Sequence, residues 1–142
     1  MNRGEAFKVR ISARGYEVDG NGHVAGVVLL QYGQHARWEA LRAAGLEQDL
    51  LLRSGMAPVS LEESIRFHSE VRAGDELDVS CEYIWGGGKT FQVQQELRRP
   101  DGALVAEITN VGGLLDLKER KLTPNPGHNL RSAARFPQLL GL

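Results

Sequence analysis

Residues 16–45 read YEVDGNGHVAGVVLLQYGQHARWEALRAAG and join a glycine-rich loop to the one long helical pattern of the chain. After the loop, apolar and small residues recur at the spacing of one helical face, namely Val28, Leu29, Tyr32, Ala36, Ala40 and Ala43. Gly45 follows these positions, and glycine readily adopts the left-handed conformation that ends many helices. The stretch therefore predicts one helix from about residue 27 to Gly45, preceded by a loop that holds Asp19 and His23.

Strand patterns flank this helix. Residues 7–14 alternate between apolar and polar side chains, which is the two-residue period of a half-buried strand. Four more strand-like runs follow, at residues 59–71, 77–85, 90–99 and 103–117, separated by the turn sequences RAGDE, GGGK and PDG. We expect these four runs to form an antiparallel meander. The order of elements predicts an α+β fold whose sheet buries one face on the helix.

The end of the chain has a different character. After Lys118 no period is sustained, and residues 123–142 contain three of the five prolines. We therefore expect a single domain at residues 1–123 and an irregular C-terminal tail at residues 124–142.

Composition excludes several classes of protein. A chain of 142 residues has the size of one domain with one core. No apolar run approaches the roughly 20 residues of a membrane helix, so we expect no membrane partner. The net charge of −1 lacks the strong positive field typical of nucleic-acid-binding proteins. The N-terminal residues show no apolar segment of a signal peptide, which favours the cytoplasm.

Cysteine and histidine usage excludes two further features. Cys81 is the one cysteine, so no internal disulfide is expected, and its place in a strand-like run indicates a buried thiol. The four histidines are scattered through the sequence, without acids or cysteine at the spacing of metal ligands. No metal site is therefore predicted.

Three short motifs in this order resemble the hotdog fold, specifically the 4-hydroxybenzoyl-CoA thioesterase-like group of acyl-CoA thioesterases. They are the DGNGHV loop at residues 19–24, the ARWE segment at 36–39 and the GDEL segment at 74–77. The resemblance covers residues 7–117 and implies an antiparallel five-stranded sheet wrapped around one long helix. It also implies a homodimer or homotetramer with active sites between subunits.

The chemistry of thioester hydrolysis suits this loop and helix. Attack on a thioester carbonyl creates an oxyanion, and a helix N-terminus offers unpaired N–H groups to stabilise it. Hydrolysis also needs a carboxylate that activates water or attacks directly. From its residues alone Asp19 is either such a group or a turn residue, since Asp-Gly is a common turn dipeptide. The resemblance implies that Asp19 is the base or nucleophile, that the Gly26 N–H polarises the carbonyl, and that His23 orients the site. By the same resemblance, Gly22 and Val24 contact the substrate.

Other candidates lie outside the loop. Glu63 interrupts the apolar face of its strand, so it is either an acid of the active site or a residue turned to solvent by a β-bulge. Lysine and arginine side chains bind phosphate groups of the kind that coenzyme A carries. The candidates for that role are Lys89 with Thr90, Arg98 with Arg99, and the cluster Lys118, Arg120 and Lys121, although each is also compatible with an ordinary solvated charge. No cofactor is expected beyond coenzyme A as part of the substrate.

Two departures from the common thioesterase pattern concern the substrate. Ala25 and Gly26 stand where two asparagines are common, and Gln34 stands where an acid is common. The sequence favours an acyl-CoA thioesterase that releases a free acid and CoA. A non-catalytic acyl-thioester binding protein stays open, as does a hotdog enoyl-CoA hydratase or dehydratase. The hydratase loop reads D-x-N-P-x-H, whereas here Gly22 replaces the proline and His23 comes one residue early.

Overall fold

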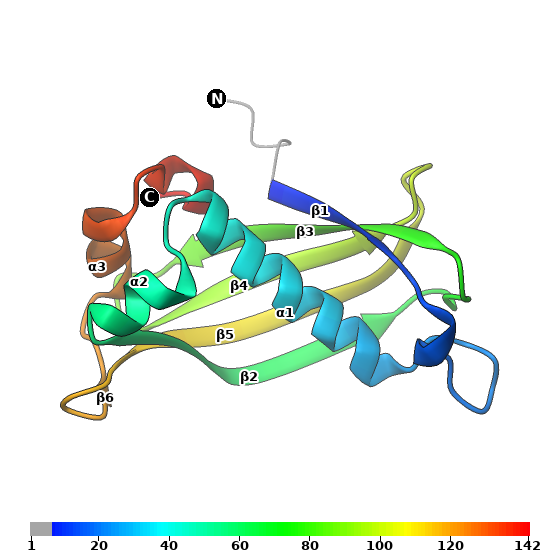
Figure 1. Ribbon diagram of the computed structural model, residues 1–142, viewed down its shortest axis with the longest axis horizontal. Coiled ribbons are helices and arrows are strands. Elements are labelled where there is room, and N and C mark those ends of the chain that lie inside the picture. Colours follow the sequence, from blue (N-terminus) through cyan, green and yellow to red (C-terminus); the bar gives the residue numbers. More distant parts are fainter. Residues whose placement is uncertain (1–6) are drawn as a thin grey trace.

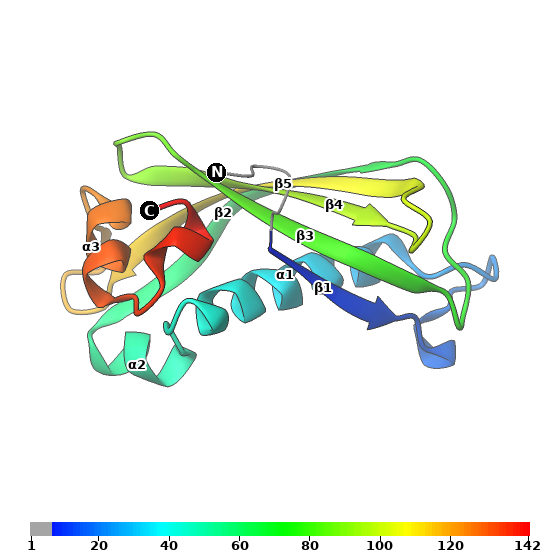
Figure 2. The same cartoon turned by 90° about the horizontal axis from the view of Figure 1, so that it is seen from above.

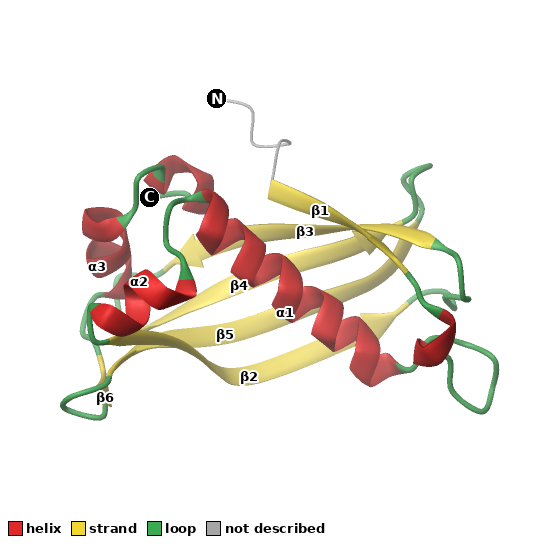
Figure 3. Ribbon diagram, in the orientation of Figure 1, coloured by secondary structure: helices red, strands yellow, loops and turns green. Residues whose placement is uncertain are grey.

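One long helix lies diagonally across the inner face of a curled antiparallel sheet (Figure 1). The computed structural model describes residues 7–142, so residues 1–6 of the predicted domain lie outside the described residues. The helices and strands, distinguished by colour in Figure 3, are β1 Phe7–Ser12, η1 Gly15–Glu17, α1 Gly26–Ala43, α2 Gln48–Arg53, β2 Met56–Phe67, β3 Glu76–Trp85, β4 Thr90–Arg98, β5 Leu104–Asp116, β6 Lys121–Leu122, α3 Pro126–Ala133 and η2 Pro137–Leu140. The predicted α+β hotdog architecture is confirmed. Among residues 7–142 no helix is long and apolar enough to cross a membrane.

The strand order corrects one part of the prediction. The five long strands follow the order β1-β3-β4-β5-β2, and the short β6 pairs with β5. Strands β3, β4 and β5 form a meander as predicted, but β2 pairs antiparallel with β5 and not with β3. Residues 68–75 carry the chain from β2 on one edge to β3 on the other side of the sheet (Figure 2). Alternation along a strand predicts which side chains are buried, but it does not predict which strand lies alongside.

Helix α1 approaches the sheet closely through its small residues. Ala36 and Ala40 are fully buried. A Cβ at Gly33 would lie 2.8 Å from Ile108 Cδ1 and 3.0 Å from Gln95 Oε1. The helix ends as predicted, because Gly45 has a φ of 88° and its N–H donates to the Arg42 carbonyl. The helix therefore packs directly against the middle of the sheet.

A β-bulge changes the inner face of β2. Its register with β5 passes from Ser60 opposite Gly112 to Glu62 opposite Val111, so one extra residue lies between them. That residue, Leu61, is 51% exposed. The bulge considered from the sequence is present, and Glu63 is an exposed residue whose side chain is nevertheless partly covered, at 27% exposure. Beyond it, Glu63 pairs with the buried Asn110 and remains on the inner face.

The predicted irregular tail is wrong. Residues 126–133 form α3, which is capped by the Asn125 side chain and has proline in its first turn. Leu130 and Leu140 are each 1% exposed. The Trp85 indole N–H donates to the Leu140 carbonyl at 2.7 Å, which fastens the segment to β3. These helices are too short to show a periodic apolar pattern in the sequence. Tertiary contacts hold them in place.

The close contact of α1 with the sheet generates a test of the fold. Substitution Gly33→Leu forces a side chain against Ile108 and Gln95. We expect the free energy of unfolding, measured by urea denaturation, to fall by about 1–3 kcal/mol, the usual cost of overpacking. The control is Gly88→Ala, where an added Cβ meets nothing within 4 Å, and its effect stays within about 0.5 kcal/mol. Equal effects in the two variants would contradict the packing described.

Candidate active site

The loop before α1 is a tight hairpin. Val18 and Val24 form an isolated antiparallel bridge. Between them, the Asp19 N–H donates to the His23 carbonyl at 2.8 Å, and the Gly22 N–H donates to the Asp19 carbonyl at 3.0 Å. Gly22 has a φ of 80°, a conformation that favours glycine. The turn reading of the Asp-Gly dipeptide is therefore confirmed, and it leaves open a chemical role for the side chain.

The Asp19 carboxylate has one oxygen engaged and one free. Its Oδ1 accepts the Asn21 N–H at 2.9 Å and the His23 N–H at 3.4 Å. Its Oδ2 accepts no hydrogen bond from any residue of the described chain. The residue is exposed. The loop thus holds the carboxylate in place while one oxygen faces solvent, as a base or nucleophile requires.

His23 is held by an acid that the sequence did not reveal. Its Nε2 lies 2.5 Å from Glu70 Oε2, in the connection between β2 and β3. The Arg72 guanidinium donates to the other oxygen of Glu70 at 2.7 Å. This hydrogen bond holds the pKa of Glu70 below its usual value, with a smaller contribution from His23. Asp19, His23, Phe67 and Glu70 together line an open hollow of about 420 Å³.

The first turn of α1 presents unpaired backbone donors beside this loop. Val28 and Leu29 donate to the Ala25 carbonyl, whereas the N–H groups of Gly26 and Val27 have no acceptor within residues 7–142. The Phe67 ring covers Gly26 so closely that a Cβ would lie 2.9 Å from its Cζ. Glycine at this position thus leaves room for the ring. The geometry offers an oxyanion-binding site at the helix N-terminus.

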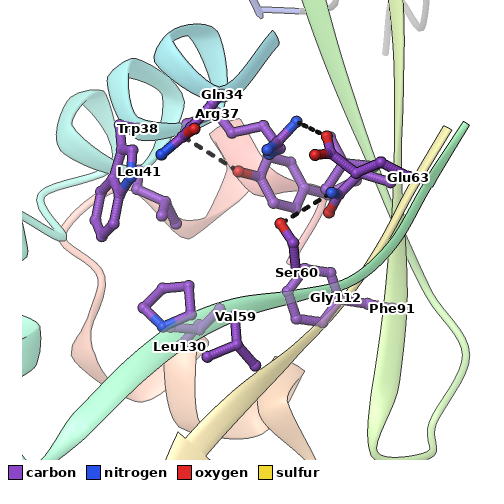
Figure 4. A pocket seen from close by; sticks show the side chains of 14 residues that line it. Gln34, Arg37, Trp38, Leu41, Val59, Ser60, Glu63, Phe91, Gly112 and Leu130 are labelled. Atoms are coloured by element: carbon purple, nitrogen blue, oxygen red, sulfur yellow. Dashed lines mark hydrogen bonds and ion pairs between the residues drawn. The ribbon is translucent and has the colours of Figure 1, made fainter. Parts of the chain in front are cut away.

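A second hollow lies between α1 and the sheet, closer to the C-terminal half of the helix. This cavity of about 380 Å³ is lined by Arg37 and Trp38 from α1, Ser60 and Glu63 from β2, and Leu130 from α3 (Figure 4). Glu63 Oε2 lies 3.2 Å from Arg37 Nη1, and its side chain is only 27% exposed. Glu63 therefore lines this cavity and not the hollow beside Asp19, and its role as an acid of the active site stays a prediction.

The structure does not gather the predicted phosphate-binding residues in one place. Thr90 begins β4 opposite Gly113, and Lys89 precedes it, at the end of the sheet away from the Asp19 loop. Arg98 bonds to Glu96 and to the Gly102 carbonyl. Arg99 is close to the loop, but it donates to Asp75 and to the Glu70 carbonyl.

The basic cluster Lys118, Arg120 and Lys121 borders the β5–β6 turn, also far from the Asp19 loop (Figure 1). Within the described residues no group of three or more His, Cys, Asp or Glu side chains could hold a metal ion.

Comparison with known proteins places the chain in a family. The sequence pattern of the thioesterase-like superfamily matches residues 14–136, which is most of the chain. The chain belongs to this superfamily. The resemblance stated from the sequence motifs is thereby confirmed.

Solved thioesterases share the hotdog fold of this thioesterase-like chain. Slr0204, a 1,4-dihydroxy-2-naphthoyl-CoA thioesterase from Synechocystis, has a TM-score of 0.80 and 23% identity over 90% of this chain and 94% of its own. The probable thioesterase YbaW from Escherichia coli has a TM-score of 0.78 and 23% identity over 89% and 95%. The same fold is found in SAV2348, a hypothetical protein from Staphylococcus aureus that was solved in complex with CoA. It has a TM-score of 0.81 and 15% identity over 96% of this chain and 86% of its own.

A curated relative matches part of the thioesterase-like chain more closely in sequence. The chloroplastic acyl-acyl carrier protein thioesterase ATL3 of Arabidopsis thaliana is 37% identical over 77 residues. The match covers 54% of this chain and 40% of that protein.

The segment that carries Glu70 generates a test of pH dependence. Asp75 Oδ2 accepts the Arg72 N–H and an Arg99 N–H, each at 2.9 Å, and these bonds hold the pKa of Asp75 below its usual value. A group with a lowered pKa in the folded state stabilises it above its ordinary pKa, and this contribution disappears as pH falls through the lowered pKa. We expect Asp75→Asn to lower the free energy of unfolding by about 1 kcal/mol at neutral pH.

The difference between wild type and Asp75→Asn should shrink as pH falls below about 4. Urea denaturation across the acid range measures it. The exposed Glu119→Gln serves as the control and should match wild type throughout. A difference between wild type and Asp75→Asn that stays constant with pH would contradict the assignment.

Proposed function

We propose that this chain hydrolyses an acyl-CoA to a free acid and CoA at the N-terminus of α1. The observation that carries the proposal is an arrangement within residues 7–142. The Asp19 carboxylate has one oxygen that accepts no hydrogen bond, and its loop leads into the N–H groups of Gly26 and Val27, which have no acceptor. This combination supplies both requirements of acyl transfer, a group that activates the attacking oxygen and donors for the oxyanion.

The thioester carbonyl accepts hydrogen bonds from the N–H groups of Gly26 and Val27. Negative charge grows on that oxygen as the carbonyl carbon becomes tetrahedral, and the positive end of the α1 dipole stabilises it. The Phe67 ring against Gly26 keeps water from one side of this position. The donors therefore contribute more in the transition state than in the bound substrate, which is the condition for catalysis.

Asp19 Oδ2 acts by one of two routes. As a general base it removes a proton from water, whose oxygen bonds to the carbonyl carbon while the carbon–sulfur bond breaks. As a nucleophile it forms an anhydride, expels the thiolate of CoA, and is released by water. In both routes the thiolate takes up a proton. His23, fixed by Glu70, contacts the substrate and orients the loop around the carboxylate.

CoA is the carrier that we propose, with support from relatives. One structural neighbour is a 1,4-dihydroxy-2-naphthoyl-CoA thioesterase, and another was solved in complex with CoA. The curated relative is instead an acyl-acyl carrier protein thioesterase, so the carrier belongs among the variables of the test.

The assembly that we propose is a homodimer formed along β2, with active sites between the subunits. Two such dimers can also pair into a tetramer. Strand β2 has 12 residues and pairs only with β5 in the described chain, so its second edge is open. Leu61 and Phe67 on this strand are 51% and 55% exposed. A long edge strand with exposed apolar residues readily pairs with a second copy. Because Phe67 covers Gly26, a partner on this edge borders the proposed oxyanion site.

The role of Asp19 is tested by Asp19→Asn. Thiol release is measured on short, long and aromatic acyl-CoAs and on the corresponding acyl carrier protein thioesters. We expect wild type to hydrolyse at least one substrate, and the variant to lose at least about a hundredfold in kcat, the size of a lost acid-base group.

The matched control for this test is Asp49→Asn, an exposed acid on α2 that should retain full activity. If Asp19→Asn and wild type turn over equally, the carboxylate is a turn residue alone. If wild type binds acyl thioesters without hydrolysing any, the binding-protein reading replaces the enzyme.

The assembly is tested by Leu61→Asp and sedimentation equilibrium. A charge on the open edge of β2 opposes strand pairing, so we expect the dimer to dissociate at concentrations where wild type is dimeric. The control, Ile84→Asp, changes an exposed apolar residue of β3, which β4 and β5 separate from β2, and should leave the dimer intact. A monomeric wild type would refute the proposed assembly.

A further inference from the structure

The cavity between α1 and β2 contains an arginine whose hydrogen bonds are incomplete. The Arg37 side chain is only 11% exposed. Its Nη1 is shared between Gln95 Oε1 at 2.9 Å and Glu63 Oε2 at 3.2 Å. Its Nε and Nη2 have no acceptor within the described chain, and Arg37 lines the cavity. Figure 4 shows the ion pair of Arg37 with Glu63 among the side chains that line this cavity.

Acceptors lie near the free edge of Arg37. Glu63 Oε1 has no donor in the described part of the chain. Asn110, which is 3% exposed, uses its Nδ2 on Ser60 Oγ at 3.0 Å and leaves its Oδ1 for the cavity. The charges of Arg37 and Glu63 balance, so the site is neutral while still offering both donors and acceptors.

These groups discriminate between acyl groups by their polarity. A plain alkyl chain in the cavity displaces water and leaves the Arg37 N–H groups without acceptors, which is costly in a partly buried site. A carboxylate would add a second negative charge beside Glu63. A hydroxyl group fits both neighbours, because its oxygen accepts from Arg37 while its hydrogen is donated to Glu63.

The position of Arg37 along α1 specifies where such a hydroxyl must lie. Arg37 comes 11 residues after Gly26 in α1, which is roughly 16 Å along the axis. Trp38, Leu41 and Leu130 provide the apolar part of the wall around it. For an acyl group that extends along α1 from the proposed carbonyl site, the recognised oxygen is therefore remote from the thioester, toward the far end of the chain.

We infer that Arg37 and Glu63 select acyl thioesters that carry a hydroxyl group remote from the thioester, and bind that hydroxyl between the guanidinium edge and the carboxylate. The inference rests on the proposed thioesterase function. Arg37 acts here as a specificity-determining residue, and it takes no part in breaking the carbon–sulfur bond.

The test compares kcat/KM for ω-hydroxyacyl-CoAs and unsubstituted acyl-CoAs of equal chain length. We expect wild type to prefer the hydroxylated member by about tenfold or more, as for a hydrogen bond to a charged group. Arg37→Met removes this preference and retains turnover of the unsubstituted member. Arg37→Lys keeps the charge but not the edge of two N–H groups, so it retains only part of the preference. The control is Arg42→Met on the same helix, at 68% side-chain exposure, which should keep the wild-type preference.

Two further measurements separate the possible failures. Because Arg37→Met leaves Glu63 without its cation, the double variant Arg37→Met with Glu63→Gln repeats the test without an unpaired charge. Calorimetry with free ω-hydroxy, ω-carboxy and unsubstituted fatty acids measures selection without turnover. Hydrolysis without preference, or tightest binding of the ω-carboxy acid, overturns the inference and leaves the thioesterase in place. Selective binding that depends on Arg37 in a chain that hydrolyses nothing upholds the inference and refutes the proposed function.

Discussion

The close approach of α1 to the sheet is the constraint on which the rest of the structure depends. Gly33, Ala36 and Ala40 let the helix backbone come within contact of the sheet, where a single added carbon at Gly33 would collide with Ile108. Burial of an apolar face against a sheet is what stabilises a helix of this length, since propensity alone is marginal. This contact also determines where both ends of the helix lie relative to β2, and hence where the two hollows open.

The buried Gln95 side chain lies between α1 and the sheet, and its hydrogen bonds connect the core to the cavity. Gln95, at 1% exposure, donates to the Gly33 carbonyl and to Cys81 Sγ, while its oxygen accepts from Arg37. A buried amide of this kind is tolerated because its N–H and carbonyl groups form hydrogen bonds. Its hydrogen bond to Arg37 fixes the position of the guanidinium on the cavity wall. Burial raises the pKa of the Cys81 thiol to about 12, so this cysteine is a packing residue with no reactive thiolate.

The two hollows along α1 divide the chemistry of the proposed enzyme. At the N-terminus, Asp19 and the N–H groups of Gly26 and Val27, which have no acceptor within residues 7–142, are proposed to act on any thioester, whatever its acyl group. About three turns further on, the Arg37 and Glu63 pair is proposed to act only on what the acyl chain carries. Separation of this kind allows the remote site to change without disturbing the reacting atoms, because the helix holds the distance between them.

The sequence by itself determined the long helix, its small-residue face, the strands and the placement of Asp19 and His23 in one loop, because these follow from local periodicity and turn chemistry. It did not reveal that β2 lies beside β5, that Glu70 meets His23, or that the last residues fold over Trp85. Those features join residues far apart in the chain, and no local pattern encodes a partner that distant. Only the tertiary structure, by bringing separate segments into van der Waals and hydrogen-bonding range, decided them.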